Sequence, residues 1–312
     1  MRITVLAGGI GGARFVRGLR RAHPDAEITV IGNTGDDLWL HGLRVCPDLD
    51  TLMYTLGGGV HEDQGWGRAD ETFAIAAELE AHEVEGTWFT LGDRDIATHL
   101  IRSQMLRAGF PLSDVTAALC RRWQLGVTLL PMTDDRAETH VVIDSDGGRR
   151  AVHFQEWWVR MHAEVPAVEF AFVGIEEARP APGVLSALAE ADAILLAPSN
   201  PVVSVGPILA VPGLRPALID ANAAVVGVSP IIGGRAVRGM AEACLTATGV
   251  EVSAAGVGAM WSDLLAGWLV SPEDADTQVP EVTVRAVPLL MSDEGAAADL
   301  AAAAVTLAQE LA

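Results

Sequence analysis

Short apolar runs rich in β-branched residues alternate along the chain with longer stretches of helical periodicity. This alternation is typical of an α/β fold with a mostly parallel sheet. The predicted strands are Ile3–Ala7, Ile28–Ile31, Val127–Leu130, Glu169–Val173, Ala193–Ala197 and Ala224–Val228. The predicted helices are Ala13–Ala22, Asp70–His82, Ile96–Ala108, Leu112–Trp123, Gly183–Glu190, Val237–Thr246 and Gly295–Leu311. We therefore expect a Rossmann-like, mostly parallel sheet flanked by helices.

The segment Thr139–Phe154 has a different pattern, with two alternating runs around a turn at Asp146-Gly147-Gly148. Such runs predict a β-hairpin. We expect residues 1–60 and 165–312 to form a nucleotide-binding core, and residues 61–164 to form a smaller mixed α+β insertion with helices and this hairpin. The alanine-rich last helix is expected to be a packing helix, within the fold or at a subunit interface.

Composition excludes several classes of protein. Half of the 312 residues are hydrophobic, which excludes a disordered chain. A formal net charge of −20 argues against general binding to nucleic acids or membrane surfaces. All 21 basic residues are arginines, so neither a Schiff-base lysine nor a P-loop lysine exists. Three separated cysteines, no leader pattern and no apolar run long enough to span a bilayer predict a cytoplasmic protein.

A glycine-rich loop, Gly8-Gly9-Ile10-Gly11-Gly12-Ala13-Arg14, directly follows the first predicted strand. Glycines let the backbone approach a ligand, and the free N–H groups of the next helix attract phosphate. The loop does not fit the dinucleotide pattern, because Arg14 takes the place of the last glycine and Asn33 follows the second strand where an acidic residue is needed. A phosphate-binding loop of another kind and a tight strand–helix turn remain the two interpretations.

Acidic residues follow the second strand, first in Asn33-Thr34-Gly35-Asp36-Asp37 and then at Asp48 and Asp50. Carboxylates at the carboxyl edge of a parallel sheet suit Mg²⁺, which prefers hard oxygen ligands. One of Asp48 and Asp50 would instead cap a helix starting near Thr51. Metal ligation by at least one carboxylate and a capping or surface role are both open.

Two further loops, Ser199-Asn200-Pro201 and Ser229-Pro230-Ile231, follow predicted strands and would join the glycine loop at one sheet edge. They fit a nucleotide's phosphates and base, although three independent turns are the alternative. In the turn before Ile96, Asp93 or Asp95 would cap the helix and Arg94 would bind an anionic or carbonyl group. His153 is expected to be a hydrogen-bonded structural histidine.

Phosphate binding in so acidic a protein needs local positive charge. Helix N-termini, Arg14, Arg94, Arg235 and a divalent cation could supply it. This combination favours metal-assisted phosphoryl chemistry over hydride transfer.

The ordered motifs lead further. GGIGGAR, NTGDDLWLHG, PDLDT, GWGRADETF, LGDRDIATH, LPMTDD, HFQEWW, LAPSNPVVSVGPIL and SPIIGG together resemble the 2-phospho-L-lactate transferase family of coenzyme F420 biosynthesis. The resemblance runs from Ile3 to about Met291 and is strongest to the actinobacterial branch, whose members use a phosphoenolpyruvyl donor. In that branch enolpyruvyl-diphospho-5'-guanosine, or its lactyl counterpart in the archaeal branch, gives its phospho-group to the ribityl hydroxyl of the deazaflavin Fo. The products are dehydro-F420-0 or F420-0, and GMP.

The resemblance also implies site residues. Asp50 would contact Mg²⁺ and the Fo hydroxyl as the catalytic residue, with Asp48 as a second metal ligand. Arg94 and Thr98 would join Asp50 around Fo. The guanosine diphosphate part would be held by Gly9, Gly11, Gly12, Arg14, Asn33, Ser199, Asn200, Pro201, Ser229, Pro230 and Ile231. A homodimer acting on small molecules, with no nucleic-acid or membrane partner, is expected.

Two other functions compete with this one. A related group shares the glycine loop, binds nucleotide-sugars and regulates cell-wall metabolism, but LGDRDIATH and HFQEWW argue against it. An NAD-dependent oxidoreductase is disfavoured by Arg14 and Asn33.

Overall fold

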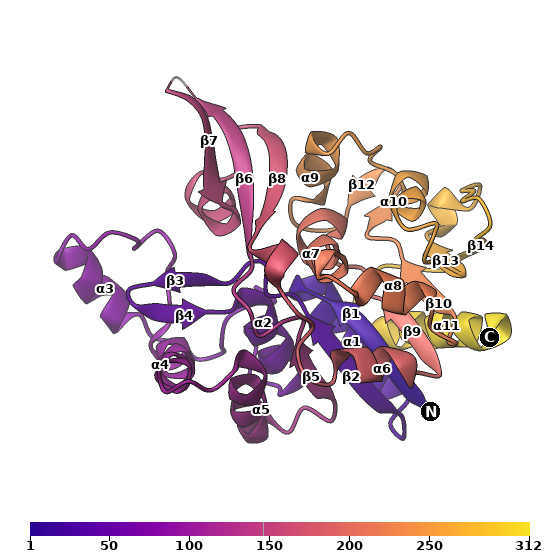
Figure 1. Cartoon of the computed structure of the whole chain (residues 1–312), viewed down its shortest axis with the longest axis horizontal. Helices are drawn as coiled ribbons and strands as arrows, with labels where there is room; N and C mark the ends of the chain where they lie inside the picture. Colours follow the sequence, from indigo (N-terminus) through magenta and orange to yellow (C-terminus); the bar gives the residue numbers. More distant parts are fainter. Residues whose placement is uncertain (146) are drawn as a thin grey trace.

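The computed structural model describes residues 1–145 and 147–312, so only Asp146 of the predicted hairpin turn lies outside the described residues. A seven-stranded parallel sheet in the order β14-β13-β10-β9-β1-β2-β5 forms the centre (Figure 1). Its strands are β1 (Arg2–Ala7), β2 (Glu27–Gly32), β5 (Thr128–Pro131), β9 (Ala193–Leu196), β10 (Val225–Val228), β13 (Gly267–Val270) and β14 (Thr283–Ala286). The predicted Rossmann-like α/β fold is thereby confirmed.

Helices cover both faces of this sheet. They are α1 (Gly9–Ala22), α2 (Pro47–Leu56), α3 (Ala74–Ala81), α4 (Asp93–Arg107), α5 (Leu112–Trp123), α6 (Val184–Ala189), α7 (Gly206–Ala210), α8 (Leu214–Ile219), α9 (Ala241–Ala247), α10 (Ala254–Met260) and α11 (Glu294–Leu311). Alternate strand residues enter different cores: Val5 packs with α1 and α11, whereas Leu6 packs with α6 and α8. The last helix is a packing helix, because its Ala297 lies against Gly18 of α1.

A second, antiparallel sheet of β6 (Glu138–Ser145), β7 (Gly148–His153) and β8 (Ala167–Val173) projects from the body in Figure 1. The predicted hairpin is its β6–β7 pair. Two-stranded ribbons form from β3 (Leu38–Leu40) with β4 (Leu43–Val45), and from β11 (Ile231–Ile232) with β12 (Arg235–Ala236). Among the described residues no helix is long and apolar enough to cross a membrane.

Several predicted elements differ from the observed ones. The strand predicted at Glu169–Val173 lies in the antiparallel sheet as β8, where it pairs with β6. The central sheet also contains β13 and β14, which the strand pattern did not predict. β14 is a short edge strand whose two end residues are exposed. The predicted insertion 61–164 contributes β5 to the central sheet. The proposed division into a core and an insertion otherwise stays a prediction.

Some helix starts were also wrong. Helix α1 begins at Gly9, four residues before the predicted start, because the glycine loop itself winds into the first turn after an extended Gly8. The helix predicted from Asp70 begins at Ala74, since Asp70 has a left-handed backbone (φ +54) that a helix cannot include. The one predicted from Val237 begins at Ala241.

Candidate active site

The glycine loop lies where the strand order reverses, between β1 and β9. Open α/β sheets bind ligands at the carboxyl end of such a switch point. Here the loop is locked to the loop after β9: the Gly8 N–H donates to Ser199 Oγ (3.1 Å), and Ser199 Oγ donates to the Gly8 carbonyl (2.7 Å). A Cβ on Gly12 would lie 2.7 Å from Ser199 Oγ, so this close approach requires glycine.

The other predicted loop residues also shape the backbone. The Asn200 side chain accepts hydrogen bonds from the N–H groups of Val202 and Val203, just inside the helical turn that begins at Pro201. Ser229 Oγ donates to the carbonyl of Ile231 and accepts from its N–H. Because β9 and β10 are neighbours, the structure brings both loops to the edge that carries the glycine loop. Their side chains are used within the loops, so it is their backbones that can meet a ligand.

Asp48 lies directly beneath the glycine loop. Helix α2 begins at Pro47 and not near Thr51, and proline fits a first helical position because its missing N–H has no partner there anyway. The Asn33 amide donates to Asp48 Oδ2 (2.9 Å) and to the carbonyl of Val203 (3.1 Å), which joins β2, α2 and the β9 loop. Burial raises the pKa of Asp48 to about 6, although hydrogen bonds from Asn33, Gly9 and Ser204 act in the opposite direction.

Asp50 points elsewhere, into the interface between α2 and α4. The Arg102 guanidinium, 2% exposed, binds both carboxylate oxygens of Asp50, at 3.0 Å through Nη1 and at a shorter distance through Nη2. His99 Nδ1 lies 3.7 Å from Asp50, and His99 Nε2 lies 3.4 Å from Asp95. Ligand atoms of Asp50, Asp95 and His99 come within 4.8 Å of one another, as in a metal site. Arg102 already supplies one positive charge there, next to Asp50.

The loop after β2 adds two buried carboxylates, Asp36 and Asp37. Burial raises the pKa of Asp36 well above its usual value, and repulsion from Asp48 and Asp37 adds to this. Gln155 donates to Asp36 Oδ2 (3.3 Å), whereas Oδ1 has no hydrogen-bond partner among the described residues. Burial likewise raises the pKa of Asp37 to about 6, against the lowering effect of Arg44.

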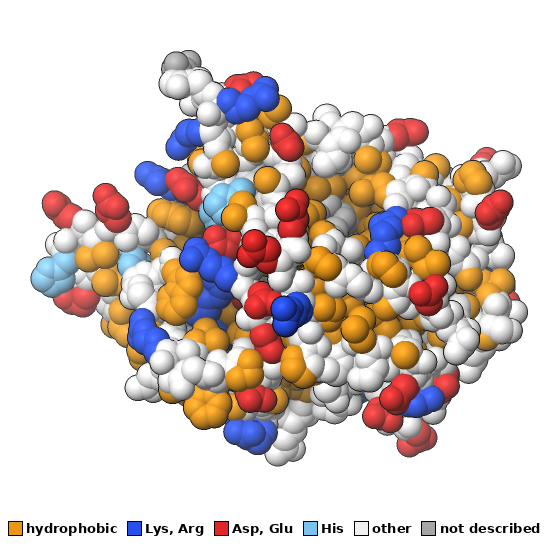
Figure 2. All heavy atoms as spheres, viewed as in Figure 1, with side chains coloured by type: hydrophobic (Ala, Val, Ile, Leu, Met, Phe, Trp, Pro, Cys, Tyr) orange, Lys and Arg blue, Asp and Glu red, His pale blue; other side chains and the backbone are white. Residues whose placement is uncertain are grey.

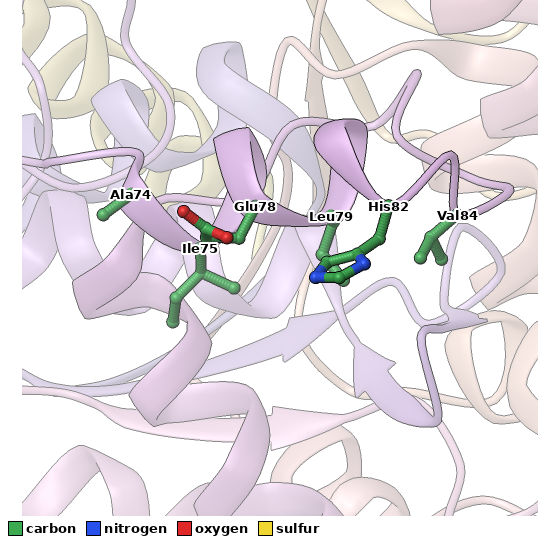
Figure 3. Close-up of a pocket in the computed structure, with 6 residues that line it drawn as sticks. All are labelled: Ala74, Ile75, Glu78, Leu79, His82 and Val84. Atoms are coloured by element: carbon green, nitrogen blue, oxygen red, sulfur yellow. The ribbon is translucent and has the colours of Figure 1, made fainter.

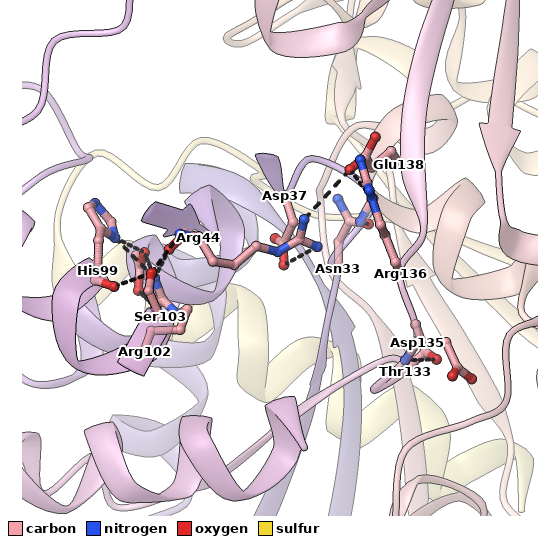
Figure 4. A network of polar contacts seen from close by, with 12 residues as sticks. Asn33, Asp37, Arg44, His99, Arg102, Ser103, Thr133, Asp135, Arg136 and Glu138 are labelled. Atoms are coloured by element: carbon pink, nitrogen blue, oxygen red, sulfur yellow. Dashed lines mark hydrogen bonds and ion pairs between the residues drawn. The ribbon is translucent and has the colours of Figure 1, made fainter. Parts of the chain in front are cut away.

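Arg44 of β4 connects the acidic loop after β2 with strand β6 and helix α4. Its guanidinium lies 3.3 Å from Asp37 and 3.7 Å from Glu138 at the base of β6, while its N–H donates to Ser103 Oγ on α4 (Figure 4). Figure 2 shows charged and histidine side chains gathered where the base of the hairpin sheet meets the β3–β4 ribbon.

His153 is hydrogen-bonded as expected, since its Nδ1 accepts the Gln155 N–H. Gln155 itself was missed, because only the fold shows that HFQEWW reaches the acidic loop.

Arg94 lies at the first turn of α4 with 53% of its side chain exposed, 3.9 Å from Asp70. Thr98, one turn further, is buried. The predicted caps were wrong: Glu71 accepts the N–H groups of Arg94 and Asp95 at the start of α4. Asp93 instead accepts those of Ala74 and Ile75 and so caps α3.

Positive charge gathers at the start of α1. Burial lowers the pKa of Arg14, and the neighbouring charges of Arg238 and Arg17 lower it further. Arg238 Nη1 donates to the carbonyl of Gln64 (3.4 Å), and neither Arg14 nor Arg238 has a carboxylate within 4.0 Å among the described residues. The sequence analysis named Arg235 as a source of positive charge and missed Arg238. Arg238 comes close to Arg14 only because the chain after β12 returns to the start of α1.

A shallow apolar groove lies outside this site. It follows α3 and is lined by Ala74, Ile75, Glu78, Leu79, His82 and Val84 (Figure 3). Figure 1 shows α3 at the far end of the molecule from the glycine loop. The groove therefore has no part in the carboxylate and arginine cluster at the sheet edge.

Known proteins resemble this chain over its whole length. Residues 3–299 match the family model described as 2-phospho-L-lactate transferase CofD. A "Phosphoenolpyruvate transferase" of Streptomyces coelicolor is 63% identical and one of Thermobifida fusca is 64% identical; each alignment covers 100% of this chain and 99% of the relative. One of Mycobacterium avium is 55% identical over 99% of both chains.

Solved structures support the fold alone. Two structures of a Bacillus halodurans protein, one titled as a member of the UPF0052 family, have TM-scores of 0.62 and 0.60 at 18% identity. They cover 97% of this chain and 99% of theirs. The family match, by contrast, extends to sequence, and it favours the transferase over the oxidoreductase and the nucleotide-sugar regulator. The chain belongs to the 2-phospho-L-lactate transferase family of coenzyme F420 biosynthesis.

Proposed function

We propose that the protein transfers the phosphoenolpyruvyl group of enolpyruvyl-diphospho-5'-guanosine to the ribityl hydroxyl of Fo, giving dehydro-F420-0 and GMP. The names of the relatives that are 55–64% identical favour this donor over the lactyl one. The observation that carries the proposal is the buried Asp48 carboxylate against the glycine loop. The helix that follows this loop carries Arg14, which lies near Arg238, and neither arginine has a carboxylate within 4.0 Å among the described residues. That arrangement suits a charged diphosphate.

The reaction forms one bond and breaks one. The hydroxyl oxygen of Fo bonds to the phosphorus that carries the enolpyruvyl group. The bond from this phosphorus to the bridging oxygen breaks, and GMP leaves with that oxygen and the electron pair. The hydroxyl proton is released, and the motif match names Asp50 as its acceptor. Because Arg102 holds both oxygens of Asp50, we expect positioning and charge neutralisation to contribute more than proton removal.

Mg²⁺ is the proposed metal, and the acidic residues at the sheet edge fit it. Among the described residues one buried oxygen of Asp36 has no hydrogen-bond partner, and Asp48 lies close enough to raise the pKa of Asp36. Hard carboxylate oxygens of this kind suit Mg²⁺. Asp48 and Asp36 would therefore hold the metal, which neutralises phosphate charge when bound. The sequence-based assignment of Asp50 as a ligand stays a prediction, as do the homodimer and the cytoplasmic location.

A turnover assay tests the proposal. Purified protein is incubated with Fo, Mg²⁺ and each of the two donors, and GMP and the deazaflavin product are quantified by chromatography. We expect both products in equal amounts, faster turnover with the enolpyruvyl donor, and loss of turnover with EDTA that Mg²⁺ restores. GMP released without a deazaflavin product would contradict Fo as acceptor. Unchanged turnover in EDTA would contradict the metal.

A further inference from the structure

Three arginines are buried in the described part of the chain, and they differ in their partners. Arg44 contacts Asp37 and Arg102 contacts Asp50, whereas Arg68, 7% exposed, has no carboxylate within 4.0 Å among the described residues. A buried cation is costly to desolvate and is normally paired. Arg68 belongs to the motif GWGRADETF, from which no residue has been placed at the substrates.

Aromatic rings take the place of a counter-ion. The Arg68 guanidinium carbon lies 5.1 Å from the centre of the Trp123 ring on α5 and 5.8 Å from the centre of the Tyr54 ring on α2. The faces of such rings attract cations. The Ala69 N–H donates to the carbonyl of Gly59 (2.9 Å), and a Cβ on Gly59 would overlap the Trp123 ring. The loop after α2 therefore lies directly on Trp123 and brings Arg68 to both rings.

Arg68 also contacts the first turn of α4, which packs beside α5 (Figure 1). Its Nη1 donates to the carbonyl of Arg94 (3.0 Å), whereas its buried Nε has no hydrogen-bond partner among the described residues. The Tyr54 hydroxyl donates to Asp95 Oδ1 (2.5 Å). The guanidinium and the tyrosine ring beside it thus hold two consecutive residues of α4.

The same loop contacts this turn through two further residues. Glu71 accepts the N–H groups of Arg94 and Asp95 (2.8 Å each), and the carbonyl of Thr72 accepts the Asp93 N–H (2.8 Å). The Glu71 bonds are exposed, so water competes for them, whereas the Arg68 guanidinium is buried. Arg68 is therefore the buried anchor of the contact between this loop and α4.

The position of this turn matters for Arg94. Its side chain is 53% exposed and its ion pair with Asp70 is 3.9 Å long, so side-chain contacts restrain it weakly. The backbone of the first turn of α4 then decides where the guanidinium lies. Tyr54 is one turn after Asp50 on α2, so the contacts of Arg68 also set this turn relative to the helix that carries Asp50.

We infer that Arg68 is a positioning residue for the acceptor substrate: it fixes the first turn of α4 relative to α2, so that Arg94 faces Fo beside Asp50. Arg68 acts through Arg94 and does not contact Fo itself. The inference rests on the proposed function, which supplies Fo as the acceptor, and it adds a residue that this site needs from outside its substrate contacts.

The first test compares two arginines that lie over the same ring. Arg68→Met keeps an unbranched side chain and removes the charge and the donors. The control is Arg122→Met, because Arg122 is exposed, lies 5.0 Å from the centre of the Trp123 ring and forms no hydrogen bond with α4 among the described residues. In Arg68→Met the affinity for Fo, measured through the fluorescence of the deazaflavin, should fall about 3- to 10-fold, as for the loss of one hydrogen-bonded contact. The KM for the donor should stay constant, and the control should match the wild type in both.

A double variant tests whether Arg68 acts through Arg94. Arg68→Met/Arg94→Ala should bind Fo as Arg94→Ala does, because no side chain is left to position. Residues that act independently would instead give losses that multiply. Multiplied losses would therefore overturn the inference, as would an effect of Arg68→Met on the donor as large as that on Fo.

Hydrogen exchange and unfolding separate the remaining outcomes. Amide exchange over residues 93–98, followed by mass spectrometry, should be faster in Arg68→Met than in the wild type and unchanged in Arg122→Met. A lower free energy of unfolding in urea together with unchanged affinity for Fo would show a merely structural arginine and overturn the inference. If the wild type neither binds nor converts Fo, the proposed function is wrong. Faster exchange in Arg68→Met alone would even then support the contact that fixes α4, and equal exchange in both variants would overturn it.

Discussion

Two carboxylates on one helix, Asp48 and Asp50, occupy opposite environments. Residues two apart on a helix point about 200° apart, so the first turn of α2 sends one toward the glycine loop and the other toward α4. Both are buried, yet only Asp50 has a cation, the equally buried Arg102. The donors to Asp48 in the described part of the chain are neutral, and burial raises its pKa to about 6. The Asp50 side is complete within the protein, whereas the Asp48 side leaves negative charge for a ligand or metal to neutralise.

The largest expected effect on stability comes from removing one partner of the buried Asp50–Arg102 ion pair. Arg102→Leu leaves the Asp50 carboxylate buried without its cation, which should lower the free energy of unfolding by about 3–5 kcal/mol. The double variant Asp50→Leu/Arg102→Leu should recover most of that loss, because neither charge of the pair is then left buried without its partner. Urea unfolding at pH 7 measures both.

The control is Arg215→Leu, which removes an ion pair with Asp263 whose side chains are 37% and 49% exposed. It should change stability by less than about 1 kcal/mol. The double variant also tests the catalytic assignment of Asp50: if it folds and transfers at the wild-type rate, Asp50 is structural. A folded but inactive double variant would support the motif-based prediction.

Removing the charge of Asp48 should lower turnover and leave folding unchanged. Asp48→Asn keeps the shape and removes the charge, so we expect kcat/KM for GMP formation to fall at least a hundredfold, about 2.7 kcal/mol of barrier. The thermal midpoint at pH 8 should stay equal or rise, because the buried carboxylate of Asp48, ionised at that pH, is gone from the folded state. The exposed Asp25→Asn is the control. A loss of less than tenfold would show that Asp48 does not contact the reacting groups.

The comparison also shows what sequence could reveal. The glycine loop, the strands around it and the acidic pair were predictable, because each depends on local pattern and on the rule that parallel strands end at one edge. Which of Asp48 and Asp50 faces that edge depends on where α2 begins. Pro47 was the available signal, since proline favours a first helical turn. A helix starting near Thr51 was predicted there instead.

Partners from distant segments could not be predicted. Arg102 lies 52 residues from Asp50, Gln155 lies 119 from Asp36, and Arg238 is far from Arg14 in the chain. These pairs form only when α4, the hairpin sheet and the β11–β12 ribbon are placed around the central sheet. Sequence motifs named the segments, but the contacts between them are a property of the fold.

A smaller effect concerns pH, through the contact between the hairpin and the acidic loop. Burial lowers the pKa of His153 to about 4, so between pH 4 and its ordinary 6.5 the unfolded chain binds a proton that the folded one does not. Stability should therefore fall as the pH falls through this range. Asp37, with a pKa raised to about 6, acts in the opposite direction, because its folded form holds a proton that the unfolded chain releases.

Comparing the wild type with His153→Gln isolates the contribution of His153 to the pH dependence of stability. Between pH 6 and pH 4.5 the wild type should lose about 2 kcal/mol relative to His153→Gln, which cannot be protonated. Urea unfolding at several pH values gives this difference, and His162→Gln, on an irregular segment, is the control. Parallel pH profiles for the wild type and His153→Gln would show that His153 titrates in the folded protein as it does in water.

The smallest effect is expected at Arg94, on the Asp50 side but at the surface. Its ion pair with Asp70 is 3.9 Å long and both side chains are more than half exposed, so Arg94→Ala should change stability by less than about 0.5 kcal/mol. If Arg94 contacts Fo, the KM for Fo should rise severalfold while the KM for the donor stays constant. Asp70→Ala removes the same ion pair but leaves the arginine, and its kinetics should match the wild type. Equal changes in both KM values would show that Arg94 acts on the site as a whole and does not contact Fo. The surface of α4 at Arg94 would then make no direct contact with the acceptor substrate.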